Sequence, residues 1–267
     1  MAKEVLHLLD SSLEKPKNVE HRHFSLSVFS TKSRYHDKNQ DSLGGIWFTD
    51  GSCVLAVADG VGSCPRAHEA SQIGVQEVTS MVAKAGQGGS YRGPILNAFE
   101  RANERILSEL KRSGSTLVAI EIHNDWIRAY HAGDSLAMLF GGRGKQKYLT
   151  VGHSPFDMAQ DVGLNTVHQD ESEMRNTVTN CLGELDMRIE VGPKVATSPQ
   201  DTVIMGSDGL FDNVDVELEV QHSLSGGPEA IVGSLTEKSL SHMYAPVSDA
   251  YCKPDDLTLL AFRRNPP

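Results

Sequence analysis

The residues in this sequence that are best suited to metal binding or catalysis are aspartates that border short apolar segments. The pattern recurs at Asp59, Asp134, Asp208 and Asp255. Aspartate is a poor strand residue, but at the end of a strand a turn exposes its carboxylate. A single Asp-Gly pair is an ordinary turn, whereas repetition at successive strand ends favours a shared site.

Several carboxylates at one place require a counter-ion. Two packed sheets bring strand ends together, so we expect these aspartates to converge at one edge of a sandwich. Converged carboxylates repel one another and cannot all stay ionised unless a cation compensates. Because the sequence has no cysteine cluster or paired-histidine ligand set, the pattern favours Mg2+ or Mn2+ over zinc.

The segments that position these aspartates have the length and composition of β-strands. Strands are predicted at residues 24–29, 53–58, 116–122, 126–132, 135–140, 202–205 and 257–262. The links 123–125 and 133–134 are short enough for antiparallel hairpins. Apolar residues that recur on one face predict helices at residues 66–84, 92–111, 216–222 and 228–242.

This order of elements lacks the strand–helix alternation of a parallel sheet, so we expect α+β layers with antiparallel sheets. A single domain is predicted over residues 1–267, with residues 1–22 as an N-terminal extension. Residues 153–180 show no sustained periodicity and are rich in His, Asp, Glu and Asn. A loop of that length is usually functional or mobile.

Composition limits the functional classes. The formal charge of −10 argues against a nucleic-acid partner. The 4 cysteines are spread singly, which fits reduced thiols. The N-terminal segment is too short and too charged for a signal peptide or membrane span. We therefore expect a cytoplasmic protein without a membrane or nucleic-acid partner.

Short motifs recur in a fixed order along the chain: Asn39-Gln40-Asp41-Ser42, Ala58-Asp59-Gly60-Val61-Gly62, Gly114-Ser115-Thr116, Ala132-Gly133-Asp134-Ser135, Leu149-Thr150-Val151-Gly152-His153-Ser154, Ser207-Asp208-Gly209-Leu210-Phe211-Asp212 and Asp255-Asp256-Leu257-Thr258. This set resembles the motifs of the metal-dependent type 2C serine/threonine protein phosphatases, especially compact bacterial members. Each motif alone is nonspecific, but together they run in register from about residue 24 to residue 263.

The resemblance implies a four-layer αββα sandwich with two central antiparallel sheets, and it implies a ligand set. Asp59 would bridge two Mn2+ or Mg2+ ions, and the Gly60 carbonyl would bind one of them. Asp41, Asp208 and Asp255 would complete the shell of the first ion, and Asp134 would serve a third ion together with Asp208. Residues 153–180 fall where the family carries its mobile flap.

Several positions depart from the family pattern. Gln40 stands where the family has a metal-adjacent glutamate, and Val61 stands where some relatives carry a histidine after Asp-Gly. The phosphate-binding arginine of the family corresponds to His36. Arg34 is the candidate for that catalytic role beside Asp59, with Arg66 as an alternative.

The exact ligand at the C-terminal end stays open, because Asp255-Asp256 replaces the Asp-Asn of the family. Among the histidines, His153 is the one considered to lie near the site.

The expected activity is hydrolysis of phosphomonoesters in phosphorylated proteins by a metal-activated water, with targets of a bacterial Ser/Thr kinase as substrates. No Cys-x5-Arg loop for a cysteine-based mechanism is present. Two alternatives stay open: a catalytically weak or silent module that binds phosphoproteins, and a phosphohydrolase of nucleotides or small molecules.

Overall fold

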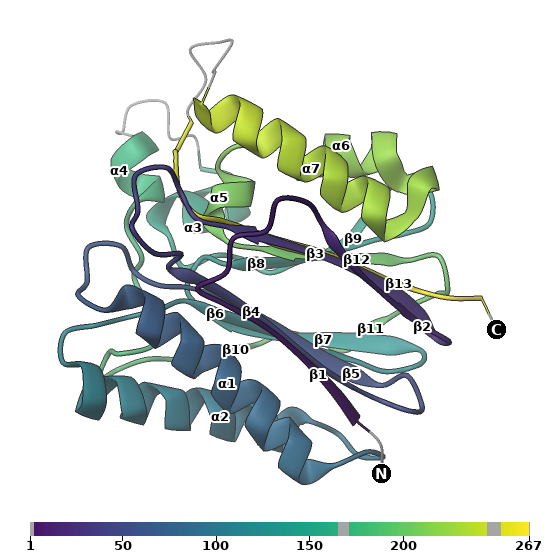
Figure 1. Cartoon of the computed structure of the whole chain (residues 1–267), viewed down its shortest axis with the longest axis horizontal. Helices are drawn as coiled ribbons and strands as arrows, with labels where there is room; N and C mark the ends of the chain where they lie inside the picture. The colour runs from purple at the N-terminus through teal and green to yellow at the C-terminus, as the bar shows by residue number, and fades with distance from the viewer. Residues whose placement is uncertain (1–2, 165–170, 245–251, 267) are drawn as a thin grey trace.

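The computed structural model describes residues 3–164, 171–244 and 252–266. Within these ranges the chain forms four layers, with two antiparallel sheets packed face to face and helices over both outer faces (Figure 1). The predicted α+β sandwich is confirmed.

The first sheet has the strand order β1-β4-β5-β6-β7-β10, and β11 also pairs with β7. Its strands are β1 (Lys3–Leu9), β4 (Asp41–Phe48), β5 (Cys53–Asp59), β6 (Leu117–Ile122), β7 (Trp126–Ala132), β10 (Glu190–Val191) and β11 (Val195–Ala196). The strands β4, β5 and β6 are almost entirely buried because both of their faces are covered.

The second sheet has the order β2-β3-β13-β12-β8-β9. Its strands are β2 (Lys17–His21), β3 (Phe24–Thr31), β8 (Leu136–Phe140), β9 (Gln146–Leu149), β12 (Thr202–Gly206) and β13 (Leu257–Arg264). All pairings between named strands in the described part of the chain are antiparallel.

The helices lie outside the two sheets. They are α1 (Ala67–Ala85), α2 (Arg92–Arg105), α3 (Pro155–Asp161), α4 (Glu171–Arg175), α5 (Asp208–Phe211), α6 (Val216–Ser223) and α7 (Gly227–Tyr244). A π-helical segment, Ile106–Leu110, continues α2. No described helix has the length and apolar character that a membrane crossing requires.

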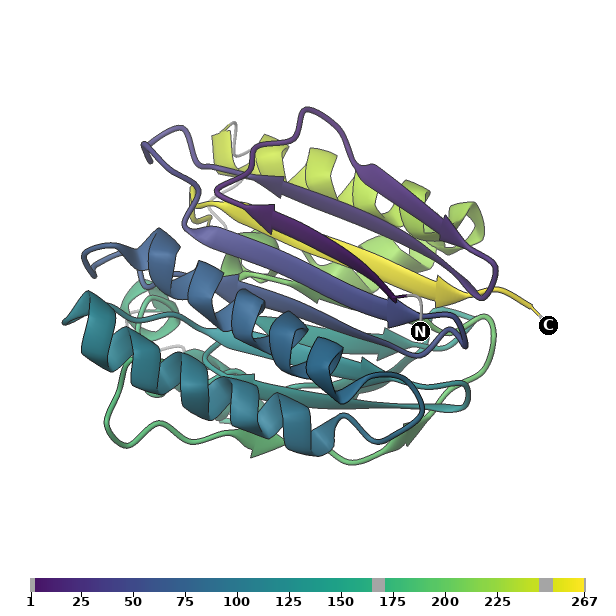
Figure 2. The ribbon, with the colours of Figure 1, turned by 60° about the horizontal axis from the view of Figure 1, so that its bottom comes forward.

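Three apolar clusters join the layers. One packs α1 and α2 against the first sheet, through residues such as Val78 and Phe99. A second fills the space between the sheets, and a third packs α6 and α7 against the second sheet. Figure 2 shows α1 and α2 side by side over the strands of the first sheet. These layers hold the ends of β4, β5, β12 and β13 in fixed relative positions.

The predicted strands and helices are present, but the strands β1, β2, β4, β9, β10 and β11 were not predicted. Residues 1–22, predicted as an N-terminal extension, supply β1, which pairs with β4, and β2, which pairs with β3. The strand β4 itself escaped prediction because Gly44 and Gly45 interrupt its apolar pattern. A Cβ at Gly44 would lie 2.4 Å from Val75 Cγ1, so glycine allows α1 to pack closely on β4.

One predicted connection is wrong. The link 123–125 joins β6 and β7 as an antiparallel hairpin, as expected, but 133–134 does not join a second hairpin. Instead the chain crosses to the other sheet, where β8 lies between β12 and β9. Gly133 makes this crossing with φ of 110°, and a Cβ there would lie 2.5 Å from Thr116 Cβ. The crossing places Asp134 between the sheets.

The segment predicted as a flap contains α3 and α4. Ser154 caps α3 by accepting the Asp157 backbone N–H at 3.0 Å. Residues 165–170 of this segment lie outside the described residues.

Candidate metal centre

The predicted metal-binding aspartates come from strand ends in both sheets. Asp41 begins β4 and Asp59 ends β5, and the two are directly opposite in the antiparallel register. Asp208 begins α5 just after β12, and Asp255 precedes β13, the neighbour of β12. Because the sheets pack face to face, all of these ends meet at one edge of the sandwich.

A cavity of about 260 Å³ opens at this edge. Its lining includes most of the predicted ligand positions, namely Asp59, Gly60, Asp134, Asp208 and Asp255. Asp41 is buried next to them, where its Oδ2 accepts a hydrogen bond of 2.7 Å from Ser207 Oγ. The structure therefore brings together every residue that the sequence predicted for metal binding.

Hydrogen bonds from the Gly-Ser-Thr and Gly-Asp-Ser motifs hold Asp59 in place. Thr116 Oγ1 accepts from the Asp59 backbone N–H at 2.9 Å, and Ser115 Oγ donates to the Asp59 carbonyl at 2.9 Å. Thr116 Oγ1 also lies 2.7 Å from Ser135 Oγ, next to Asp134. These contacts tie the end of β5, which carries Asp59, to the crossing between the sheets, which carries Asp134.

Burial and mutual repulsion dominate the electrostatics of the cluster. Burial, followed by repulsion from Asp208, raises the pKa of both Asp59 and Asp134 well above its ordinary value. Burial and then Asp256 raise the pKa of Asp41 in the same way. Burial, followed by repulsion from Asp208, raises the pKa of Asp255 to about 6. Such carboxylates can all be ionised only beside a cation.

The residues fit a divalent cation. Within the described chain, Asp41 Oδ1 and Asp208 Oδ1 are buried and have no hydrogen-bond partner. Buried anionic oxygens without donors are costly unless a cation binds them. An all-oxygen ligand set of carboxylates and the Gly60 carbonyl is the kind that Mg2+ and Mn2+ prefer.

A lysine supplies one cation from the chain itself. Lys253 Nζ contacts Asp208 Oδ2 and lies 3.0 Å from Asp255 Oδ2. Burial acts to lower the pKa of Lys253, but the carboxylates of Asp208, Asp255 and Asp59 outweigh it and raise the pKa above the ordinary value. Lys253 was not predicted from the sequence, because the prediction rested on carboxylates. It stands only two residues before Asp255.

The two adjacent aspartates at the C-terminal end have different surroundings. Asp256 is buried and accepts hydrogen bonds of 2.6 Å from the backbone N–H groups of Ser33 and Gln40. His36 Nδ1 lies 3.0 Å from the same carboxylate. Asp255 instead lines the cavity. Asp256 thus fixes the loop before β4, while Asp255 faces the cavity, where it pairs with Lys253.

The predicted arginine does not reach the cavity. The Arg34 guanidinium lies over the Tyr244 ring, 4.1 Å from its centroid, and the Arg34 backbone N–H donates to Tyr244 Oη at 3.1 Å. The alternative, Arg66, pairs with Glu69 at 2.6 Å on the exposed start of α1. The turn at residue 33 is held by Asp256, which directs the next side chain toward α7.

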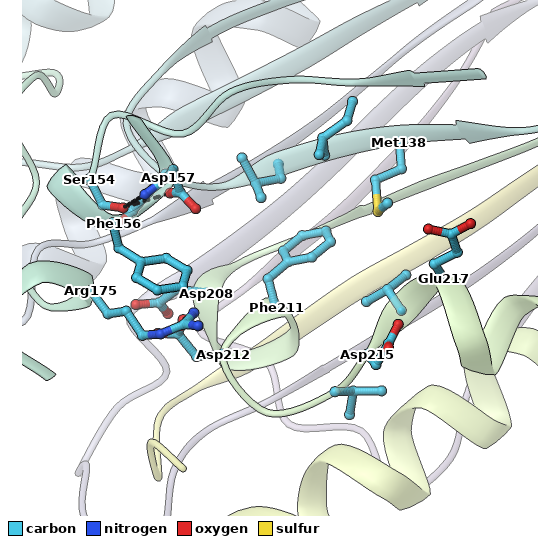
Figure 3. Close-up of a pocket in the computed structure, with 15 residues that line it drawn as sticks. Met138, Ser154, Phe156, Asp157, Arg175, Asp208, Phe211, Asp212, Asp215 and Glu217 are labelled. Atoms are coloured by element: carbon cyan, nitrogen blue, oxygen red, sulfur yellow. Dashed lines mark hydrogen bonds and ion pairs between the residues drawn. The ribbon is translucent and has the colours of Figure 1, made fainter. Parts of the chain in front are cut away.

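Among the described residues, Arg175 is the arginine that lines the cavity, and it was not predicted from the sequence. Its Nη1 lies 2.8 Å from Asp212 Oδ1, and its guanidinium lies 3.5 Å from the Phe156 ring centroid (Figure 3). No pattern in the sequence marks it, because it lies in the aperiodic segment 153–180.

His153 lies outside the cavity lining and forms hydrogen bonds with the turn before Asp134. Its Nδ1 accepts from the Gly133 backbone N–H at 2.9 Å, and its own backbone N–H donates to the Gly133 carbonyl at 3.1 Å. Asn180 Nδ2 also lies 3.0 Å from His153 Nδ1. His153 therefore holds the turn that carries Asp134.

Comparison with known proteins gives one family. The sequence profile of the protein phosphatase 2C family matches residues 31–226. No curated protein matches the chain.

Solved structures share the fold over nearly the whole chain. The PPM Ser-Thr phosphatase MsPP from Mycobacterium smegmatis is 25% identical, with 89% of this chain and 97% of that chain covered and a TM-score of 0.69. Stp1 from Staphylococcus aureus is 19% identical, with 96% of each chain covered and a TM-score of 0.72. The PstP catalytic domain in complex with 2 manganese ions is 20% identical, with 91% and 99% covered and a TM-score of 0.68.

The ordered motifs, the sandwich of two antiparallel sheets and the profile match over most of the chain agree with one another. The chain belongs to the protein phosphatase 2C family of serine/threonine phosphatases.

Proposed function

We propose that this protein is a metal-dependent protein serine/threonine phosphatase and that its substrates are phosphorylated proteins, such as targets of a bacterial Ser/Thr kinase. The observation that carries the proposal is the convergence of Asp59, Asp208 and Asp255 at one cavity with Asp41 buried beside them, where the buried Asp41 Oδ1 and Asp208 Oδ1 lack donors.

In this proposal Asp59 and the Gly60 carbonyl hold divalent ions together with Asp41, Asp208 and Asp255, and Asp134 serves a third ion with Asp208. The manganese ions bound by the PstP catalytic domain support Mn2+ as one candidate. Bound ions of this kind supply a water of lowered pKa and neutralise charge on phosphoryl oxygens.

The chain itself positions the reactants. Thr116 and Ser115 fix Asp59 by hydrogen bonds to its backbone. Gln40 and His36 line the cavity and can orient water or phosphate by hydrogen bonding. Arg175 and Lys253, the Arg and Lys side chains that line this cavity, offer donors to phosphate oxygens once their carboxylate partners are compensated.

The test is hydrolysis of a phosphothreonine peptide by the purified protein with Mn2+ and with EDTA. We expect turnover that requires the metal and disappears in Asp59→Asn. Asp186→Asn, which removes an exposed carboxylate outside the site, is the matched control and should retain full activity. Metal-independent turnover, or equal turnover by Asp59→Asn, would contradict the proposal.

A second candidate is a weak or silent module that binds phosphoproteins. The ammonium of Lys253 on two proposed ligands, together with the absence of Arg34 from the cavity, favours it. It predicts that the folded, metal-loaded protein binds a phosphopeptide without hydrolysing it. A nucleotide phosphohydrolase would instead prefer nucleotides when the two substrates compete.

A further inference from the structure

A second cavity, also of about 260 Å³, lies beside the metal centre. The two cavities share Asp134, Arg175 and Asp208, so they adjoin at these residues. The second cavity has an apolar floor formed by Leu136, Met138, Leu149, Phe156, Phe211 and Val214. We call this second cavity the side groove.

Carboxylates surround the apolar floor of the side groove. They belong to Asp157, Asp212, Asp215 and Glu217. Figure 3 shows Asp215 and Glu217 on the far side of Phe211 from Asp208. The side groove thus leads away from the metal centre and becomes acidic at its outer end.

The acidic groups at the outer end are available to a partner. Asp215 and Glu217 are exposed. Asp215 Oδ1 accepts the Leu218 backbone N–H at 3.0 Å, and Glu217 Oε1 accepts from Gln221 at 3.3 Å. Neither forms an ion pair within the part of the chain that the structure describes. The arginine that lines the side groove, Arg175, pairs with Asp212.

We propose that the side groove binds the substrate segment next to the phosphorylated residue, and that it selects an apolar side chain together with a lysine or arginine. This inference rests on the proposed function. A phosphoryl group at the metal centre places its neighbouring residues at the edge marked by Asp134 and Asp208, where the side groove begins.

The charge and the apolar surface of the side groove favour a basic, apolar peptide segment over an acidic one. Apart from Asp134 and Asp208 at the metal centre, the described residues of the lining include four carboxylates and one guanidinium. The lining is therefore acidic, so an acidic peptide is repelled and a basic one attracted. The half-buried Phe156 and Phe211, with Leu149 at 38% exposure, offer apolar surface to a flanking side chain.

Two phosphothreonine peptides of equal length test the inference, one with Leu and Lys flanks and one with Ser and Glu flanks. With Mn2+ present, we expect kcat/KM for the first peptide to exceed that for the second by about tenfold, with the preference falling as salt rises. The preference should lie mainly in KM, because the flanks bind without touching the reacting atoms.

Charge removal in the side groove should weaken this preference. The double variant Asp215→Asn with Glu217→Gln should reduce the peptide ratio by about threefold to tenfold. Asparagine at position 215 keeps the acceptor that caps α6. Leu149→Ser should reduce the contribution of the leucine flank alone. Glu237→Gln, an exposed charge on α7, is the matched control and should leave the ratio unchanged.

Hydrolysis of p-nitrophenyl phosphate separates the two proposals, since this substrate has no flanking residues. If it is hydrolysed but the peptides react equally, the side-groove inference is overturned and the proposed function stands. If neither it nor the peptides are hydrolysed, the proposed function fails, and fluorescence anisotropy of the same peptides on the Mn2+-loaded protein decides the inference. Tighter binding of the basic, apolar peptide supports it, and equal binding overturns it.

Discussion

Buried carboxylates occupy opposite ends of the first sheet, with Glu121 alone at one end and the aspartate cluster at the other, and their surroundings differ. Glu121, opposite Val54 in the pairing of β5 and β6, is fully buried and accepts 2.7 Å hydrogen bonds from the Tyr91 backbone N–H and from Tyr130 Oη. His123 Nε2 lies 2.9 Å from it. Burial acts to raise the pKa of Glu121, but these hydrogen bonds outweigh burial and lower it.

At the other end of β5, Asp59 and Asp41 have raised pKa values. Burial and repulsion raise them by more than the Lys253 ammonium lowers that of Asp59 and the Ser207 hydrogen bond lowers that of Asp41. A buried carboxylate surrounded by donors completes the fold without a ligand. A buried carboxylate cluster without them requires a cation. The difference separates a structural carboxylate from a candidate site better than burial alone, since both groups are buried.

The largest effect is expected from Asp59→Asn or Asp208→Asn. Each should lower phosphopeptide hydrolysis by about a thousandfold or more, because ion-dependent stabilisation of the transition state is worth several kcal/mol. In EDTA, the Tm of Asp59→Asn should stay unchanged or rise, since this substitution removes a repelling charge. Steady-state kinetics and thermal denaturation check both results. A large loss of Tm in EDTA would mean that these aspartates are structural.

Glu121→Gln should lower stability and leave activity intact, which is the reverse of the result expected for the site aspartates. We expect the free energy of unfolding to fall by about 2–4 kcal/mol, because the amide presents donors to groups that already donate. The activity of the folded fraction should remain. Urea denaturation and kinetics at low temperature measure the two quantities. Lost activity in a stably folded Glu121→Gln would show that the two ends are not independent.

Lys253→Met tests whether the lysine ammonium and a divalent ion compete for the same carboxylates. Because a divalent ion must displace the ammonium from Asp208 and Asp255, its removal should raise Mn2+ affinity by about tenfold, which is about 1.4 kcal/mol. Titration calorimetry measures the affinity directly, and Lys238→Met on α7 serves as the control. An unchanged Mn2+ affinity would exclude competition between ammonium and metal.

A smaller effect is expected from pH. Burial raises the pKa of Asp255 to about 6 and that of Asp212 to about 7. In EDTA these carboxyls stay protonated in the folded state while the unfolded chain ionises them, so they contribute stability that is lost as pH rises through 6 and 7. The gain in Tm from Mn2+ should therefore be larger at about pH 7.5 than at about pH 5.5, where the ion displaces protons. A gain independent of pH would contradict this.

Much of the fold could be predicted because its signals are local. The strands that carry Asp59, Asp134 and Asp208 are short apolar segments that end in turns, and the amphipathic helices show their period in the sequence. The strand β4 could not be found this way, since Gly44 is selected by the close approach of α1 rather than by strand propensity. The crossing after Gly133 looks like a hairpin locally, and only the second sheet determines its course.

The anionic half of the site was predictable and the cationic half was not. The aspartates occur in ordered motifs, whereas Lys253 and Arg175 reach the cavity only through tertiary folding. Arg34 was chosen for its position near Gln40 along the chain. The anchoring of Ser33 by Asp256, which turns Arg34 toward Tyr244, cannot be read from sequence spacing.

The central claim is that the carboxylates at the end of β5 hold divalent ions. An anomalous difference map from crystals grown with Mn2+ tests it most directly. We predict peaks coordinated by Asp59, Asp208 and Asp255, with Lys253 displaced from its two carboxylate partners. A map without such peaks, with Lys253 still bound to Asp208 and Asp255, would contradict the account.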